Sequence, residues 1–161
     1  MVDQVIICAE SWPLAGDFST SREVKTAANT IVVEIQKNGI MGRGECFPLK
    51  RFGNTQDSVC AEIEAVKDQI LAIDRDGLQK LLPAGAARNA VDCALWDWQA
   101  KAMDKTLGEI LGFKSIKPLN TSYTLSLDTP ERMALNAGAH PEFKILKMKM
   151  NGSSDDVERI K

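Results

Sequence analysis

Residues 143–152 read Phe-Lys-Ile-Leu-Lys-Met-Lys-Met-Asn-Gly. Apolar residues alternate with lysines over this short run and an Asn-Gly pair follows, which together predict a β-strand that ends in a turn. Because successive side chains of a strand point to opposite faces, Lys147 and Lys149 are predicted to share one face. Their Cα atoms would lie roughly 6.6 Å apart, two residues at the rise of a strand. The stretch therefore predicts two neighbouring ammonium groups on one side of a sheet.

Three readings of this lysine pair are open from the stretch alone. Both side chains could be solvated on a half-exposed strand, which is the common case for lysine. If water is excluded instead, each positive charge disfavours protonation of the other, and a lysine in such a place can act as a base near neutral pH. A lysine beside another cation also suits Schiff-base chemistry, so a nucleophilic role for Lys147 or Lys149 is the third reading.

The lysine strand is the second of two predicted strands that a helix separates. Residues 121–127 (Thr-Ser-Tyr-Thr-Leu-Ser-Leu) predict the first strand. Residues 128–131 (Asp-Thr-Pro-Glu) combine a capping hydroxyl, a proline at the first helical position and an early acid, so a helix is predicted from there to about Ala137, closed by Gly138. Another helix is expected to begin at residues 153–156. This order predicts the opening of a parallel β/α architecture, whose two strands cannot cover their own edges.

The preceding residues predict a different architecture, in which three strands precede a group of helices. Strands are expected at residues 4–9, 30–36 and 40–47, and the tight Lys37-Asn38-Gly39 connection favours an antiparallel meander. The long segment 13–28 and the segment 48–55 are expected to be loops. Helices are expected along the apolar stripe of Val59, Ile63, Val66, Ile70 and Ile73, and at residues 77–82, 86–103 and 106–111.

Small residues predict a close packing contact within this first part. Gly42 and Gly44 in the third strand suggest a bulge or a close backbone approach. One face of the helix at 86–103 consists mostly of alanines, so another element can come near it. Asp92 and Asp97 on the same helix are expected to pair with Arg88 or Lys101 or to face solvent, since side chains four residues apart meet on a helix.

Composition narrows the classes of function. The 161 residues are 44% hydrophobic and 26% charged, which is typical of a globular protein. A net charge of -2 predicts no nucleic-acid or membrane partner and favours a small substrate. Cys8, Cys46, Cys60 and Cys93 form no CxxC pair, so no zinc site is expected, and they are predicted to be small core residues in a reducing compartment. With no leader-like start, a cytoplasmic location is expected.

Several segments resemble one enzyme superfamily when they are taken in this order. They are residues 10–14 (Glu-Ser-Trp-Pro-Leu), 44–46 (Gly-Glu-Cys), 51–53 (Arg-Phe-Gly), 81–101, 121–130 and the Lys147-Met148-Lys149 pair. The chain resembles the enolase superfamily and, more narrowly, its L-Ala-D/L-Glu (dipeptide) epimerases. The resemblance implies an α+β capping domain at residues 1–117, built from a three-stranded antiparallel meander plus helices. Residues 118–161 would begin a (β/α) barrel of the TIM type that remains incomplete.

The resemblance also implies roles for individual residues. Lys149 would be the acid/base that removes and returns the proton next to a carboxylate, and Lys147 beside it would contact the substrate carboxylate. Thr124 matches a substrate-contacting threonine. The segments 13–28 and 48–55 would close over the site. Either Arg22 or Lys25 would bind the terminal carboxylate of a dipeptide, and the choice between them stays open.

The chemistry of such an enzyme requires groups that this chain is not expected to supply. Removing a proton next to a carboxylate concentrates negative charge, which the family stabilises with magnesium held by carboxylates on later strands. Asp155, Asp156 and Glu158 lie together at a helix start, so they are not expected to be those ligands, which would lie beyond Lys161. The family's opposing lysine is also on a late strand. We therefore expect an N-terminal fragment of a magnesium-dependent dipeptide epimerase that is inactive alone.

One alternative reading is not catalytic. The capping domain could be a binding or interaction module, with the open edge of the partial barrel pairing with another chain to form an oligomer.

Overall fold

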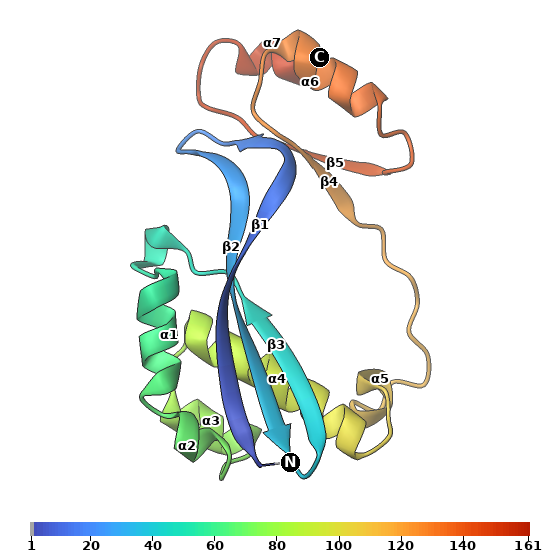
Figure 1. The fold of residues 1–161 in the computed structure, drawn as a ribbon. Coiled ribbons are helices and arrows are strands. Elements are labelled where there is room, and N and C mark those ends of the chain that lie inside the picture. The colour runs from blue at the N-terminus through green and yellow to red at the C-terminus, as the bar shows by residue number, and fades with distance from the viewer. Residues whose placement is uncertain (1) are drawn as a thin grey trace. The chain divides into compact units, whose positions relative to one another are not determined.

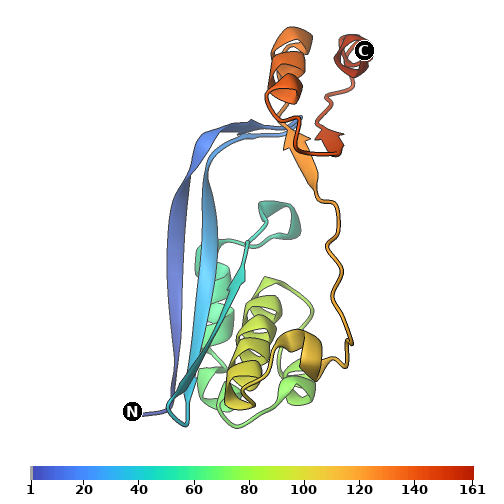
Figure 2. The ribbon, with the colours of Figure 1, turned by 90° about the vertical axis from the view of Figure 1, so that its right-hand side faces the viewer.

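The computed structural model describes residues 2–161, which divide into two compact units (Figures 1 and 2). The first unit comprises the chain up to Trp12 together with Asn29–Ile116. The second comprises Pro13–Ala28 and Lys117–Lys161. No helix in the described part of the chain combines the length and the apolar character that crossing a membrane requires.

A three-stranded sheet has the order β1 (Gln4–Ser19), β2 (Val24–Lys37), β3 (Ile40–Cys46), and the hairpin end of β1 and β2 within Pro13–Ala28 belongs to the second unit. Strands β2 and β3 pair antiparallel from Ile31 opposite Cys46 to Lys37 opposite Ile40. Asn38 and Gly39, which join them, have φ values of 54° and 76°. Positive φ at both central residues fits the tight hairpin turn whose twist matches that of the strands. The predicted meander is confirmed.

The prediction of a loop at residues 13–28 is wrong, because β1 and β2 extend through most of this segment. Only residues 20–23 connect the two strands, and the Thr20 hydroxyl oxygen accepts the backbone N–H groups of Arg22 and Glu23, both at 3.2 Å. Most residues from 9 to 26 are exposed or half-buried. A ribbon that buries neither face has no alternation of apolar and polar residues, so its sequence does not indicate a strand.

Helices cover the sheet of the first unit in the predicted order, with one difference. The apolar stripe expected to form one helix belongs to two, α1 (Gln56–Glu64) and α2 (Lys67–Ile70), although Val59, Ile63 and Ile70 are all buried in one core. The segment predicted as a loop at 48–55 contains a 3-10 turn, η1 (Lys50–Phe52). The remaining helices are α3 (Arg75–Leu81), α4 (Ala86–Ala102) and α5 (Leu107–Ile110).

Helix α4 packs directly on β3, as the small residues predict. A Cβ atom on Gly42 would overlap the carbonyl oxygen of Ala94, and one on Gly44 would overlap the carbonyl oxygen of Ala90. The close backbone approach is therefore confirmed, and only glycine fits at both positions. The Asp97 carboxylate pairs with Lys101 at 2.6 Å, which was one of the predicted pairings.

Two details of this unit differ from prediction. Asp92 pairs with Arg75 of α3 at 3.2 Å rather than with Arg88. Of the four cysteines only Cys46 is buried, whereas Cys60 is half-buried and Cys8 and Cys93 are exposed. The prediction of four core cysteines is therefore wrong. A sequence pattern cannot tell a small residue in the core from a small residue at the surface.

The second unit contains β4 (Ser122–Leu125), α6 (Pro130–Gly138), β5 (Ile145–Met148) and α7 (Asp156–Ile160). Strands β4 and β5 are parallel, and their register runs from Ser122 opposite Ile145 to Leu125 opposite Met148. The predicted β/α order is confirmed, although both strands are shorter than their apolar runs suggest. The capping signal is also confirmed, since Thr129 accepts the Arg132 N–H and Pro130 occupies the first helical position.

Candidate active site

The two lysines lie at the carboxyl end of β5, beside β4. Strand register places Thr124 next to Lys147, and the Lys149 N–H donates to the Leu125 carbonyl at 3.1 Å, so extended pairing continues one residue past β5. Directly paired residues of neighbouring strands point to the same side, as do residues two apart. Thr124, Lys147 and Lys149 therefore share one face, on which Lys147 is exposed and Lys149 is half-buried.

The opposite face of β4 carries the core of the second unit. Leu125 is buried there, Met133 of the adjacent helix α6 is buried as well, and α6 packs against β4. The Tyr123 ring packs against the tilted ring of His140 and stacks with the ring of Phe143, with centroids 4.1 and 5.0 Å away. Because the helix and these rings occupy this side, the lysines project from the side that the helix leaves open.

The turn end of the β1–β2 hairpin is attached to the two residues that follow β4, close to the lysines. The Ser19 N–H donates to the Ser126 hydroxyl at 2.6 Å, and the Leu127 N–H donates to the Ser19 carbonyl at 3.0 Å. One residue earlier, the Phe18 ring centroid lies 5.8 Å from the Lys149 Nζ. Sequence analysis missed Phe18 and Ser126, because no local signal marks a contact between segments more than a hundred residues apart.

Both candidate cations for a substrate carboxylate belong to this hairpin end. Arg22 is exposed in the turn, and Lys25 is half-buried, with its ammonium 3.2 Å from the Glu23 carboxylate. The second unit thus contains all five residues predicted for the site: Arg22, Lys25, Thr124, Lys147 and Lys149. The other segment predicted to cover the site, residues 48–55, belongs to the first unit, where the Arg51 guanidinium lies over the Phe52 ring at 5.8 Å.

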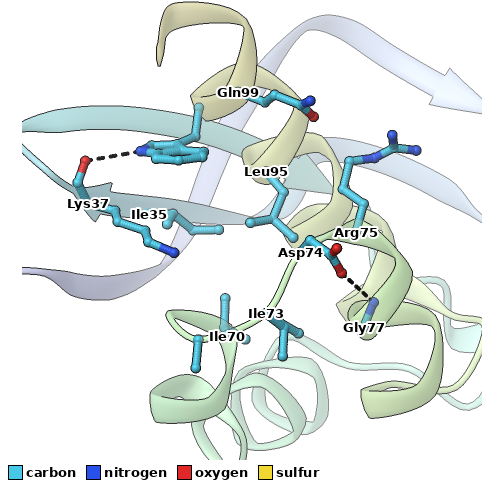
Figure 3. Close-up of a pocket in the computed structure, with 11 residues that line it drawn as sticks. Ile35, Lys37, Ile70, Ile73, Asp74, Arg75, Gly77, Leu95 and Gln99 are labelled. Atoms are coloured by element: carbon cyan, nitrogen blue, oxygen red, sulfur yellow. Dashed lines mark hydrogen bonds between the residues drawn. The ribbon is translucent and has the colours of Figure 1, made fainter. Parts of the chain in front are cut away.

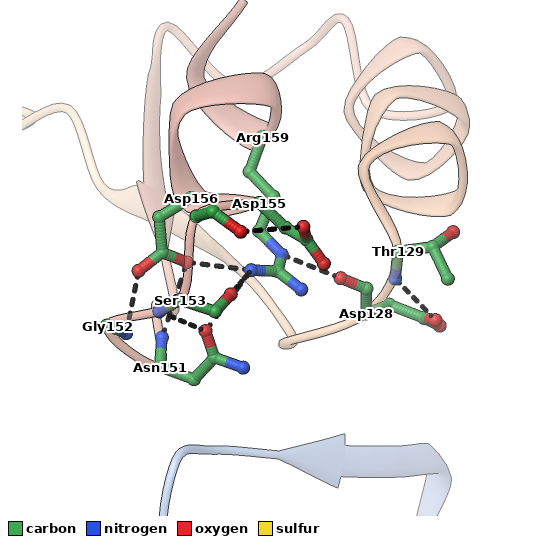
Figure 4. A network of polar contacts seen from close by, with 9 residues as sticks. Asp128, Thr129, Asn151, Gly152, Ser153, Asp155, Asp156 and Arg159 are labelled. Atoms are coloured by element: carbon green, nitrogen blue, oxygen red, sulfur yellow. Dashed lines mark hydrogen bonds and ion pairs between the residues drawn. The ribbon is translucent and has the colours of Figure 1, made fainter.

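Acids that follow the lysine strand hold the start of α7 in place (Figure 4). Asp156 accepts the Gly152 N–H at 2.7 Å and pairs with Arg159 at 2.8 Å. Burial raises the pKa of the Asp156 carboxyl, but hydrogen bonds from Gly152, Arg159 and Asn151 outweigh that effect and leave the pKa below its ordinary value. Arg159, only 7% exposed, also donates to the Asp128 carbonyl at 2.9 Å.

These acids do not fit a magnesium site. Asp156 is committed to backbone N–H groups and to Arg159, and Glu158 pairs with Lys161 at 2.7 Å. Nowhere in residues 2–161 do three or more His, Cys, Asp or Glu side chains come together in a way that could hold a metal ion. No chemical step of this chain is therefore assigned to a metal.

A separate hollow lies in the first unit between β2, α4 and the turn before α3 (Figure 3). Ile35, Ile70 and Leu95 form its apolar wall. The Lys37 ammonium donates to the Leu71 carbonyl at 2.8 Å, and the Trp98 indole N–H donates to the Lys37 carbonyl at 3.1 Å. These hydrogen bonds join the end of β2 to α2 and α4, so the polar groups of the hollow have a structural role.

Comparison with known proteins gives the family. Residues 2–112 match the family described as "Mandelate racemase / muconate lactonizing enzyme, N-terminal domain". The chain is 39% identical over 150 residues to the L-Ala-D/L-Glu epimerase of Escherichia coli, covering 91% of this chain and 47% of that protein. It is 34% identical over 164 residues to the L-Ala-D/L-Glu epimerase of Bacillus subtilis, covering 92% of this chain and 44% of that protein. The chain thus spans about half the length of the curated relatives that it matches.

Solved structures agree with this relationship. An enolase family member from Agrobacterium tumefaciens with homology to dipeptide epimerases, solved with bound sodium and L-Ala-L-Glu, has a TM-score of 0.92 at 38% identity and covers 99% of this chain and 49% of that one. The dipeptide epimerase of Cytophaga hutchinsonii, complexed with Mg and D-Ala-L-Val, has a TM-score of 0.87 at 29% identity, with coverage of 99% and 47%. Sequence and fold together show that this chain belongs to the mandelate racemase / muconate lactonizing enzyme family of the enolase superfamily, where several of its relatives are dipeptide epimerases.

Proposed function

We propose that this chain supplies the N-terminal part of a magnesium-dependent dipeptide epimerase that acts on L-Ala-D/L-Glu. Residues 1–117 would be its capping domain and residues 118–161 the first β/α units of its barrel. The observation that carries the proposal is the shared face of Thr124, Lys147 and Lys149. Similarity to enzymes that are named for this activity supports the choice of substrate.

In this proposal the chain provides one side of the reaction. Lys149 removes and returns the proton on the carbon next to the substrate carboxylate. Lys147 binds the substrate carboxylate next to the reacting carbon, and Thr124 contacts the substrate from the neighbouring strand. Arg22 or Lys25 binds the terminal carboxylate, because both are cations on the hairpin end that β4 holds.

Magnesium would be held by residues other than those described. The Mg-bound dipeptide complex of the Cytophaga hutchinsonii relative supports a metal in the family. When bound, the ion would stabilise the negative charge that proton removal creates. Because the acids of residues 2–161 do not fit such a site, the isolated chain is expected to show no epimerisation with magnesium.

A chimera tests this proposal directly. Residues 1–161 would be fused to the remaining part of the Escherichia coli relative at the aligned position, and deuterium incorporation into L-Ala-L-Glu would be followed by NMR in D2O. The folded chimera should exchange the α-proton. Lys149→Arg should abolish conversion of L-Ala-L-Glu into L-Ala-D-Glu, because a guanidinium does not act as a base near neutral pH. Lys114→Arg, an exposed change outside the site, should not.

Two results would contradict the proposal. One is a folded chimera without exchange, and the other is epimerisation that survives Lys149→Arg. Magnesium-dependent turnover by the purified 161-residue chain would overturn the expectation that it lacks half of the site.

The unpaired edge of β5 in the second unit favours one alternative function, an interaction module. Ile145, Val157 and Ile160 are exposed large apolar residues on β5 and α7, and β5 pairs only with β4 within the described residues. An unpaired strand edge beside apolar side chains can join another chain. Light scattering over a hundredfold range of concentration separates the two functions, because a monomer throughout would contradict the module.

A further inference from the structure

The contact between Phe18 and Lys149 links the hairpin end to the candidate base. The Lys149 Nζ lies 5.8 Å from the Phe18 ring centroid, which is within the range at which an aromatic face attracts a cation. Lys149 is half-buried whereas Lys147, two residues earlier on the same strand, is exposed. The ring therefore lies beside the ammonium group that is proposed to move the proton, and this lysine is the less exposed of the two.

Hydrogen bonds to the last residue of β4 and to the two residues after it hold the backbone beside both partners of this contact. The backbone of Lys149 is held by its N–H bond to the Leu125 carbonyl at 3.1 Å. The residue after Phe18 is held by two bonds, from the Ser19 N–H to the Ser126 hydroxyl at 2.6 Å and from the Leu127 N–H to the Ser19 carbonyl at 3.0 Å. Leu125, Ser126 and Leu127 are consecutive, so a single short segment sets the position of the ring and of the lysine.

The Ser126 hydroxyl strengthens this attachment because it has more than one partner. It accepts the Ser19 N–H and also lies 3.4 Å from the carbonyl oxygens of Asp17 and Ser19, to either of which its single proton can be donated. A hydroxyl that both donates and accepts across a junction restrains it in more than one direction. Phe18 sits between Asp17 and Ser19, so its backbone is restrained on either side.

We propose that Phe18 is a positioning residue for Lys149, and that Ser126 keeps the Phe18 ring over the lysine ammonium. Placement of the hairpin end that carries Arg22 and Lys25 would then also place the base. The catalytic meaning of this inference rests on the function proposed above. The contact itself does not, because it can be measured in the isolated chain.

Two measurements on the 161-residue chain test the contact. In NMR spectra, the ring current of Phe18 should shift the ε-methylene protons of Lys149 upfield of those of Lys147. In competitive acetylation followed by mass spectrometry, Phe18→Leu should raise the rate at Lys149 roughly two- to fivefold, the factor that corresponds to a partly exposed cation–π contact. The rate at Lys147 should stay the same, which provides an internal control.

Three further variants separate positioning from general loosening of the hairpin. Phe18→Tyr keeps an aromatic face and should preserve both readouts. Ser126→Ala keeps the ring but removes its anchor, so the upfield shift should shrink. Val24→Ala changes an exposed side chain of the same hairpin and should change neither readout. An unshifted Lys149 in the wild-type chain, or unchanged values in Phe18→Leu, would overturn the proposal.

Kinetic constants of the chimera test whether Phe18 affects catalysis by positioning Lys149. If Phe18 positions the base, Phe18→Leu should lower kcat with little change in KM, and Phe18→Tyr should restore it. A raised KM with unchanged kcat would instead show uniform substrate binding by Phe18 and would overturn the positioning role. If the unmodified chimera is inactive, the proposed function fails, whereas the NMR and acetylation results still decide whether the ring holds the lysine.

Discussion

Replacing Gly44 by alanine tests the packing contact on which the first unit depends. Gly44 lies on β3, directly under helix α4. An added Cβ atom would overlap the carbonyl oxygen of Ala90 and the backbone nitrogen of Ala94, and it would lie 2.9 Å from the Cys93 Cβ. Two of these three neighbours are main-chain atoms of a regular helix, so no side-chain rotation relieves the overlap.

The cost follows from how far the two elements must separate. An ordinary carbon contact needs about 3.5 Å, so strand and helix would have to part by roughly 1 Å. Ala87, Ala90, Val91 and Ala94 are fully buried in this contact, and each would lose part of its packing. Overpacking a core costs about 1–3 kcal/mol, and because the backbone takes the strain here we expect about 3 kcal/mol. A domain of this size has about 5–15 kcal/mol in total.

Urea denaturation followed by circular dichroism measures this loss, with Gly16→Ala as the control. A Cβ atom on Gly16 meets nothing within 4 Å, so the free energy of unfolding of the Gly16→Ala protein should differ from that of the wild type by less than about 0.5 kcal/mol. The Gly44→Ala protein should also melt roughly 10 °C lower. If the two variants unfolded at the same urea concentration, the reasoning about the contact between β3 and α4 would be refuted.

Three further predictions concern single groups. Thr30 is buried and its hydroxyl has no hydrogen-bond partner among residues 2–161, so Thr30→Val should raise the free energy of unfolding in urea by about 1 kcal/mol. A decrease of the same size would contradict the unpaired hydroxyl. Burial raises the pKa of Cys46 to about 11, so a thiol reagent at pH 8 should label exposed Cys8 quickly and Cys46 only on unfolding, whereas equal rates would contradict the burial. Because the pKa of Asp156 is lower in the folded protein than its ordinary value of 3.8, the ionised carboxylate stabilises the fold at pH values above 3.8, and this stability is lost as the pH falls through the folded pKa. The difference in melting temperature between the wild type and Asp156→Asn should therefore shrink from pH 7 to pH 2, and a constant difference would argue against this effect.

Local signals in the sequence were sufficient for much of the architecture. The Thr129-Pro130 pair marks the start of α6, because a capping hydroxyl and a fixed proline φ act within one turn of helix. Gly42 and Gly44 indicate a close approach, because a missing Cβ is itself the local property that allows it. Alternation around Lys147 and Lys149 predicts a strand for the same reason. In each case the chemical cause lies within a few residues of its effect.

Local signals failed where burial or distant contacts decide the outcome. The hairpin at residues 13–28 has no apolar alternation because neither of its faces is buried. The stripe from Val59 to Ile73 keeps its helical period through the break between α1 and α2, because both helices bury the same side in one core. The exposure of Cys8 and Cys93 depends on where the neighbouring elements pack.

At the candidate site, too, some features follow from local sequence and others from contacts between distant residues. The sequence alone determined that two lysines alternate with apolar residues after a β/α unit, because strand periodicity is a property of consecutive residues. Only the tertiary structure decided that the Lys149 ammonium lies 5.8 Å from the centroid of the Phe18 ring. The same junction contains the hydrogen bond from Ser19 to Ser126, 107 positions away, and no pattern of neighbouring residues encodes where two distant segments of a chain meet.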